Sequence, residues 1–409
     1  MKRVSRGVLC GLWLGLVAGL VPATAAARCE GRWQPLQVFV DDAAAAGYPG
    51  AVAVVGTGDG ATTTCVSGHA DLRRRHPMRA DAIFRIYSMS KPLASVAALT
   101  LVEDGRLSLD APVAALLPEL ATLQVLGADG RLRAPARPLT LRHLLTHTAG
   151  FAVDGPALAA REAAAPQRAA DLAGFVQRLA QAPLAADPGT VFAYDGAATE
   201  VLSRLVEVAS GQDFDRVLRT RLFVPLGMVD TGFEVPAGQR HRVVDLVAGD
   251  AGALRLADTG SARSPGSRLN AYASGAGGLY STAADYLRFA TMLRDGGQYA
   301  GRRYLRAETV AAMMDNQLHH LAAAHTSFSE YEGFGFGLSV QLDPAARGRL
   351  GAPGQVGWSG AAGTYFTLDP AHAAVALLLT QYLPEDAQAP LPKLATPFYN
   401  LVQETLADD

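Results

Sequence analysis

The sequence predicts an α+β fold in which strands from both chain ends form one sheet and a mainly helical region is inserted between them. Strand-like apolar runs lie at 51–55 and 62–66 and return between residues 334 and 379, whereas the stretch between has helical periodicity. At 409 residues, 49% of them hydrophobic, the chain can bury a large core. The expected divisions are a signal peptide at 1–27, a sheet domain at 28–95 and 271–409, and a mainly helical domain at 96–270.

The N-terminal segment has the pattern of an export signal. Three basic residues lie within the first six positions, and residues 7–27 carry no charge. Small residues at 23–27 offer cleavage sites. An uncleaved membrane anchor is the alternative, but Pro22 and the alanine-rich end favour cleavage. We expect an exported protein, periplasmic or extracellular, with no membrane attachment after cleavage.

Cysteine usage agrees with export. Cys10 lies in the signal segment, which leaves Cys29 and Cys65 in the mature chain. An even pair in an oxidising compartment indicates one disulfide, here closing a loop of about 36 residues. Two unpaired thiols are the alternative.

Composition limits the partners. The net charge is −2 and the chain has no long basic run, so no nucleic-acid partner is expected. No HExxH, paired CxxC or EF-hand loop occurs, so the sequence implies neither metal nor cofactor. The pair His319 and His320 is interpreted as part of a solvated loop.

Local patterns then assign the elements in chain order. Apolar residues at helical spacing predict a helix over 36–46, followed by the two strands. Residues 88–102 form a mostly apolar helical pattern that ends at Asp104 and Gly105. Further helices are expected from Thr140 and over 171–179, 199–209, 214–222 and 282–293, with long loops at 126–138 and 236–270. The expected C-terminal elements are strands at 334–342, 355–358, 364–368 and 373–379 and a final helix over 391–406.

Lys91 is an unusual residue in a chain that otherwise uses arginine. Of 36 basic residues only Lys2, Lys91 and Lys393 are lysine. A desolvated lysine can lose its proton and act as a base, whereas arginine cannot. Lys91 follows Ser88 by three positions, which suggests proton exchange with that serine, although chance placement is the alternative.

Ser88 is the candidate nucleophile because a helix beginning there would place Lys91 on the same face. A serine hydroxyl needs a neighbouring base to become nucleophilic. A helix start also supplies free N–H groups and positive potential for a developing oxyanion. Ser90 is a rival but points elsewhere. The four-residue pattern SxxK alone has low specificity.

The surroundings of this pattern raise its specificity. Residues 84–92 resemble the nucleophile segment of the serine β-lactamase and penicillin-binding-protein superfamily, in particular its class C-like branch, which includes carboxylesterases. Residues 141–150, 225–228 and 277–282 resemble further segments of that branch in the same order. The resemblance runs from about residue 35 to the C-terminus. It implies an antiparallel sheet flanked by helices, with the active site in the cleft beside the helical region.

The second family motif is Tyr-x-Asn, whose tyrosine shares proton transfer with the lysine. Tyr194 occupies this place, and Gly196 replaces the asparagine. The resemblance therefore implies a catalytic role for Tyr194 without the amide that contacts β-lactam substrates. His147 lies in a segment that is structural in this family.

The third family motif is Lys-Thr-Gly, for which this chain has Trp358, Ser359 and Gly360 followed by Ala361. The resemblance implies that these three residues bind substrate, with Trp358 as an apolar wall on an edge strand. By the same analogy, the backbone N–H groups of Ser88 and Ala361 form the oxyanion hole. The nucleophile-elbow motif GxSxG is not matched, because the nearest segment, 357–361, ends in alanine.

These observations predict an exported serine hydrolase that cleaves small or medium carboxylic esters through an acyl-enzyme on Ser88. The expected partner is a small-molecule ester or amide. One alternative is a class C-like β-lactamase or D-amino-acid peptidase. An alternative of another class is a non-catalytic, penicillin-binding-like ligand sensor.

Overall fold

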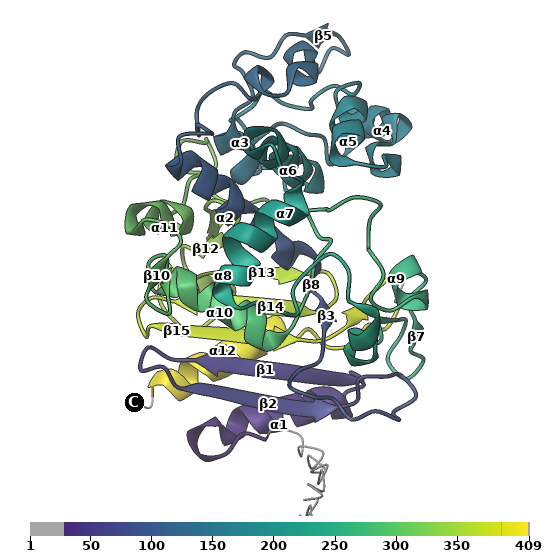
Figure 1. The fold of residues 1–409 in the computed structure, drawn as a ribbon, viewed down its shortest axis with the longest axis vertical. Coiled ribbons are helices and arrows are strands. Elements are labelled where there is room, and N and C mark those ends of the chain that lie inside the picture. The colour runs from purple at the N-terminus through teal and green to yellow at the C-terminus, as the bar shows by residue number, and fades with distance from the viewer. Residues whose placement is uncertain (1–27, 386, 408–409) are drawn as a thin grey trace, which may run out of the picture.

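A seven-stranded antiparallel sheet forms the base of the molecule (Figure 1), in the order β11-β12-β13-β14-β15-β1-β2. The computed structural model describes residues 28–385 and 387–407, so the expected signal peptide lies outside the described residues. The N-terminal β1 pairs with the C-terminal β15, with Val54 opposite Leu377. The prediction of one sheet built from both chain ends is therefore confirmed. The strands are β1 (Gly50–Gly56), β2 (Thr62–Gly68), β11 (Glu332–Phe334), β12 (Ser339–Gln341), β13 (Val356–Gly360), β14 (Thr364–Asp369) and β15 (Ala374–Leu379).

The two faces of this sheet are covered by different helices. Because side chains alternate along a strand, Ala53 of β1 packs toward α1 (Gln34–Ala45) and α12 (Ala395–Ala407). Its neighbours Val52 and Val54 join the larger core on the opposite face. Every residue of β1 and β15 is buried, as expected for central strands covered on both sides.

The remaining helices lie on the face opposite α1 and α12 or in the helical region beyond it (Figure 1). Three of these helices begin where the sequence predicted a helix start. The side chains of Thr140, Asp171 and Thr282 accept hydrogen bonds from backbone N–H groups in the first turns of these helices. The helices are α2 (Ser90–Glu103), α3 (Leu141–Leu145), α4 (Gly155–Ala164), α5 (Leu172–Leu179), α6 (Gly196–Ser210), α7 (Phe214–Leu218), α8 (Val224–Leu226), α9 (Gly260–Arg263), α10 (Ala283–Arg294) and α11 (Ala307–Met314).

Two-residue strands pair with one another within the loop regions. Strand β3 pairs with β8 and carries the segment that leads to Ser88. The short strands are β3 (Phe84–Arg85), β4 (Val125–Leu126), β5 (Leu132–Arg133), β6 (Val247–Ala248), β7 (Arg255–Leu256), β8 (Tyr280–Ser281), β9 (Gln298–Tyr299), β10 (Arg302–Arg303) and β16 (Tyr382–Leu383).

One strand prediction is wrong, and one predicted helix is present but changes its winding along its length. The strand expected over 334–342 is the end of β11, a turn and β12. Gly337 lies in this turn with φ +84°, and a side chain there would meet Ser95 Oγ at 2.2 Å. The helix expected over 214–222 changes from α7 into a π-helical turn over Arg219–Phe223, directly before α8.

Cys29 and Cys65 form the expected disulfide, which joins the segment before α1 to β2. The division between sheet and helical domains stays a prediction, and its boundary after residue 95 falls inside α2. Among the described residues, no helix has the length and apolar character needed to cross a bilayer.

Candidate active site

Ser88 lies on a tight bend between β3 and α2. Tyr87, which precedes it, has φ +44°, a conformation that costs energy for any residue except glycine. Ser88 sits in a 3-10 turn over Tyr87–Met89 that continues into α2 at Ser90. The helix was expected to begin at Ser88, and the structure begins it two residues later. The bend leaves the Ser88 side chain at the surface of two cavities.

The buried side chain of Arg85 ties the segment before this bend to a neighbouring loop. Its side chain is fully buried, and it donates hydrogen bonds to the carbonyl oxygens of Val244 (2.8 Å) and Ser261 (2.5 Å). The guanidinium also lies 5.5 Å from the centre of the Tyr280 ring. Three residues before Ser88, this arginine therefore fixes the approach to the bend against the loop over 236–270.

The Lys91 amine reaches Ser88. Its Nζ atom lies 3.2 Å from Ser88 Oγ and 2.7 Å from the carbonyl oxygen of Ala276. The residue is only 3% exposed, so this amine is shielded from bulk water. The one-turn spacing on a helix therefore brings the two groups together as expected, and Ala276 holds the amine in place.

Tyr194 approaches the same amine from the helical region. The centre of its ring lies 4.9 Å from Lys91 Nζ. Its hydroxyl accepts a hydrogen bond from Trp358 Nε1 at 3.3 Å. Tyr194 immediately precedes Asp195, the N-cap of α6, which pairs with the largely buried Arg161. The loop that carries Tyr194 is thus fixed at the start of a long helix.

His147 supports the loop that carries Tyr194. It accepts a hydrogen bond from Asp195 N–H at Nδ1 (3.3 Å), and its carbonyl oxygen accepts one from Ala193 N–H (2.8 Å). These two bonds hold the residues on both sides of Tyr194. Burial, with a smaller contribution from the Lys91 charge, lowers the pKa of His147 well below its usual value. The ring is therefore neutral, and its contacts agree with the structural role expected from the sequence.

Trp358 forms an aromatic wall beside Ser88. Its ring packs against Tyr194 (5.0 Å between centres) and Phe334 (5.2 Å), and the exposed Phe328 lies 6.2 Å away. The sequence suggested the apolar wall but not the hydrogen bond to the Tyr194 hydroxyl, because the two residues are 164 positions apart.

The expectation that Trp358 lies on an edge strand is wrong, because β13 lies between β12 and β14 in the sheet. Strand β12 flanks β13 on its outer side, with Ser339 opposite Gly357 and Val340 opposite Val356. That pairing ends at Gly357 in the described structure. The end of β13 from Trp358 onward therefore still borders the cavity.

Gly360 allows the end of β13 to approach the bend. A Cβ atom at this position would lie 2.3 Å from the carbonyl oxygen of Ile86 and 2.3 Å from Thr364 Oγ1. Ala361 follows directly and lines both cavities that Ser88 lines. The close packing at Gly360 thus brings Ala361 and Ser88 to the walls of the same cavities.

Glu200 is a buried carboxyl group behind Lys91. It lies one helical turn after Gly196 on α6 and accepts a hydrogen bond from Ser274 Oγ at Oε1. Its Oε2 atom is buried and has no hydrogen-bond partner among the residues that the structure describes. Burial raises the pKa of Glu200 to about 7, although Ser274 and the charge of Lys91 oppose the shift.

Two cavities meet at Ser88. One, of about 420 Å³, extends over the face of the sheet beside α12 and is lined by Trp358 and Ser359. The other, of about 530 Å³, extends toward α6 and is lined by Lys91 and Glu200. Ser88, Tyr194 and Ala361 line both. These volumes are typical of sites for small molecules.

Comparisons with known proteins identify the family. A family model described as Beta-lactamase matches residues 36–395. The chain belongs to the Beta-lactamase family.

Two curated relatives are esterases. The chain is 33% identical to esterase EstB of Burkholderia gladioli over 370 residues, covering 84% of this chain and 88% of that protein. It is 30% identical to lovastatin esterase of Penicillium rubens over 305 residues, covering 70% and 74% of the two chains. Among solved structures, EstCE1, described as a hydrolase with promiscuous acyltransferase activity, has a TM-score of 0.76 and 26% identity, covering 92% of this chain and 98% of that one. This member of the Beta-lactamase family is therefore a serine hydrolase.

The family motifs now have places in the structure. Gly196, at the asparagine position, lines the cavity toward α6, and a Cβ atom there would meet only Ala276 at 3.6 Å. The missing side chain therefore leaves this cavity open. At the third motif Trp358 and the exposed Ser359 both line the cavity beside α12, although their side chains lie on opposite faces of β13.

Sequence reasoning missed several residues of the site. Glu200 is a charged residue in the mostly apolar segment 196–202 of a helical stretch, and this was the available signal. Arg349, in the cavity beside α12, lies in a loop without any pattern that indicates a site.

The described residues contain no cluster of histidine, cysteine or carboxylate side chains that could hold a metal ion. His319 and His320 are exposed, and their Nδ1 atoms lie 2.7 and 2.9 Å from the carbonyl oxygens of Asn316 and Gln317.

Proposed function

We propose that this serine hydrolase is exported and cleaves small or medium carboxylic esters through an acyl-enzyme on Ser88. The observation that carries the proposal is the 3.2 Å separation between Lys91 Nζ and Ser88 Oγ. A neutral amine at this distance can accept the serine proton as Oγ attacks the ester carbonyl.

The reaction then proceeds in two steps. In the first, Ser88 Oγ forms a bond to the carbonyl carbon while its proton moves to Lys91. The backbone N–H groups of Ser88 and Ala361 stabilise the resulting oxyanion. When the ester C–O bond breaks, Lys91 and Tyr194 return the proton to the departing alcohol. In the second step, water attacks the acyl-enzyme by the same proton path and releases the acid.

The arrangement of the cavities supports an ester with two substantial halves. Because both cavities meet at Ser88, the acyl part occupies one and the alcohol part the other. An alcohol that enters in place of water would make the protein an acyltransferase. Two features favour esters over β-lactams: Trp358 stands where β-lactamases have a lysine, and Gly196 supplies no amide.

Turnover of p-nitrophenyl butyrate tests the proposal. Wild-type protein should hydrolyse it, and Ser88→Ala should lose at least about a thousandfold in kcat/KM, as expected for removal of a nucleophile. Ser90→Ala is the matched control, because the Ser90 hydroxyl accepts a hydrogen bond from Leu279 N–H (3.2 Å) and should not be needed for chemistry. Rapid nitrocefin hydrolysis without ester turnover would favour the β-lactamase or peptidase alternative.

A fluorophosphonate probe followed by mass spectrometry separates this function from a ligand sensor. The adduct should lie on Ser88. Folded protein that takes up no probe would contradict a working nucleophile at this position.

Export is the second part of the proposal. The Cys29–Cys65 disulfide supports it, because such bonds persist mainly in oxidising compartments. The full chain produced in a Gram-negative host should enter the periplasm with its N-terminus cut between residues 23 and 29. An uncut protein in the cytosol would contradict export.

A further inference from the structure

We propose that the cavity beside α12 binds the carboxylate of an anionic ester through Arg349. This inference rests on the proposed esterase function and adds a substrate class to it: esters in which either half carries a free carboxylate remote from the reacting carbonyl. The argument comes from the charges that line this cavity and from the way Arg349 is held.

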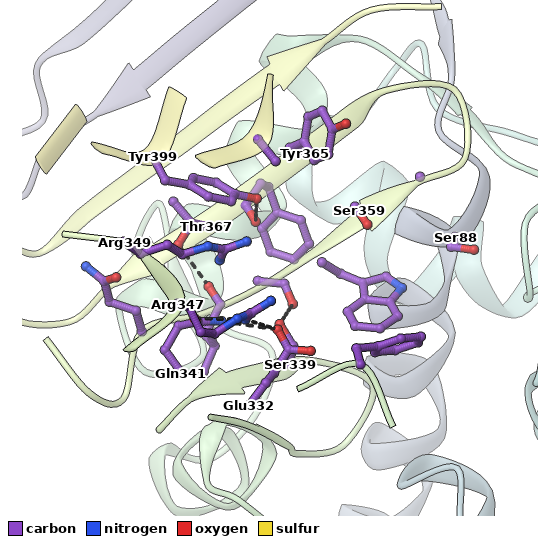
Figure 2. Close-up of a pocket in the computed structure, with 18 of the residues that line it drawn as sticks. Ser88, Glu332, Ser339, Gln341, Arg347, Arg349, Ser359, Tyr365, Thr367 and Tyr399 are labelled. Atoms are coloured by element: carbon purple, nitrogen blue, oxygen red, sulfur yellow. Dashed lines mark hydrogen bonds and ion pairs between the residues drawn. The ribbon is translucent and has the colours of Figure 1, made fainter. Parts of the chain in front are cut away.

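Two arginines and one carboxylate line the end of the cavity away from Ser88 (Figure 2). Arg347 pairs with Glu332 and also donates a hydrogen bond to Gln341 Oε1 at 3.0 Å. Glu332 accepts a further bond from Gln341 Nε2 at 3.3 Å, so its charge is satisfied within this group. Among the described residues, no carboxylate lies within ion-pair distance of Arg349. The cavity therefore keeps one uncompensated positive charge.

Arg349 is held in place before any ligand binds. Its guanidinium lies 4.6 Å from the centre of the Tyr399 ring on α12. The loop on both sides is tied to the next residue of that helix: Leu350 N–H donates to Asn400 Oδ1 (2.9 Å), and Asn400 Nδ2 donates to the carbonyl oxygen of Gly348 (3.1 Å). An arginine stacked on an aromatic ring keeps its N–H groups in one plane, which matches the planar, two-oxygen shape of a carboxylate.

The geometry also sets the distance of the anion from the reacting carbonyl. The Tyr399 hydroxyl lies 3.5 Å from the carbonyl oxygen of Phe366, and Phe366 is opposite Trp358 in the sheet. From Trp358 to Ala361 the chain advances three residues, or about 10 Å at the rise of a strand. Figure 2 shows Arg349 and Tyr399 at one end of the cavity, Ser88 at the other, and Ser359 between them. The carboxylate should therefore lie on the order of 10 Å from the carbonyl.

This site differs from the third family motif in position and in origin. The family lysine would lie at Trp358 on β13, whereas Arg349 lies in the loop between β12 and β13 and reaches the cavity from the side of α12. A neutral ester would gain nothing from this charge, so the charge should discriminate among substrates and not affect the chemical step.

The test compares charged and neutral esters of equal length. Mono-p-nitrophenyl esters of succinic, adipic and suberic acids place a carboxylate on the acyl half, and their methyl-capped forms are neutral. The butyrate ester of 6-hydroxyhexanoic acid carries a carboxylate on the alcohol half, and its methyl ester is the neutral partner. Wild-type protein should prefer the charged member of the longer pairs on the half that enters this cavity, with little preference for succinate. Equal kcat/KM within every pair would overturn the proposal.

Substitutions test whether Arg349 causes the preference for charged esters. Arg349→Gln should lower kcat/KM for the preferred charged ester about tenfold or more, mainly through KM, and leave its neutral partner within about twofold. Arg349→Lys should lose less, because the charge remains. Arg302→Gln is the matched control, since Arg302 also stacks on a tyrosine (5.2 Å to the centre of the Tyr304 ring) but lies outside this cavity. Equal losses for charged and neutral esters in Arg349→Gln would contradict the proposal.

Binding measured without turnover separates this proposal from the esterase function. Calorimetry with monomethyl suberate and Ser88→Ala protein should show binding that the double variant Ser88→Ala/Arg349→Gln loses. If wild-type protein hydrolyses no ester but this difference persists, the esterase function fails and the carboxylate site stands. If esters are hydrolysed but neither protein binds the anion, the carboxylate site fails alone.

Discussion

The folded wild-type protein should lose stability as pH rises toward neutrality, because Glu200 ionises. Replacing Glu200 by glutamine should abolish this pH dependence. Burial raises the pKa of Glu200 from 4.5 to about 7 in the folded chain. The folded state therefore holds a proton more tightly than the unfolded state does. The stability linked to this proton is fully present below about pH 4.5, and it is lost as pH rises through about 7.

The size of the effect follows from the shift. Each pKa unit corresponds to about 1.4 kcal/mol, so the gap between the two values amounts to about 3 kcal/mol. The carboxyl group is fully enclosed, so solvent does not screen this energy. Glutamine cannot ionise. Its stability relative to wild type should therefore improve by about 2.5 kcal/mol between pH about 5 and about 8, whatever constant offset the substitution introduces.

Urea unfolding followed by tryptophan fluorescence at several pH values measures this difference. The comparison between variants is needed because other groups titrate in the same range with the opposite sign. Burial lowers the pKa of His143 to about 4, and its contribution is lost as pH falls below 6.5. Ser274→Ala should move the Glu200 effect to higher pH, because the Ser274 hydroxyl lowers that pKa. Parallel stability curves for wild type and Glu200→Gln would refute the reasoning.

Three further substitutions test the geometry. Gly360→Ala should reduce kcat/KM at least about tenfold, since the new Cβ atom would lie 2.3 Å from the Ile86 carbonyl oxygen. If the variant has the same kcat/KM as the wild-type protein, the close approach at Gly360 is not needed for activity. Trp358→Phe should lower kcat about fivefold with little change in KM, because it removes the N–H donor to the Tyr194 hydroxyl but keeps the apolar wall; a change confined to KM would argue against an orienting role. Cys65→Ser should cost about 3–4 kcal/mol in urea unfolding with activity preserved in the folded protein, and an unchanged unfolding midpoint would contradict the stabilising role of the disulfide.

Local contacts of the site were predictable from the sequence. Ser88 and Lys91 are three positions apart at the start of an apolar helical pattern, and one helical turn fixes their distance. The apolar run of β1 similarly indicated a strand, and Thr140 and Thr282 marked helix starts. Each of these signals acts within a few residues, where backbone geometry decides which side chains meet.

Turns inside apolar stretches were less predictable. The run over 334–342 was expected to form one strand, yet the chain turns at Gly337, where φ is +84° and any side chain would collide with Ser95 of α2. Such a collision involves a helix more than 200 positions away. No pattern within the run itself shows it.

The sequence by itself predicted the candidate nucleophile, its candidate base and the strands at both chain ends, because these depend on spacing along the backbone. Only the tertiary structure decided that Trp358 donates to Tyr194, that Glu200 is enclosed beside Ser274 and that Arg349 stacks on Tyr399 with no carboxylate partner among the described residues. These contacts join segments that meet only when the sheet and helices bury their apolar faces together. Their partners are therefore set by packing and not by local sequence.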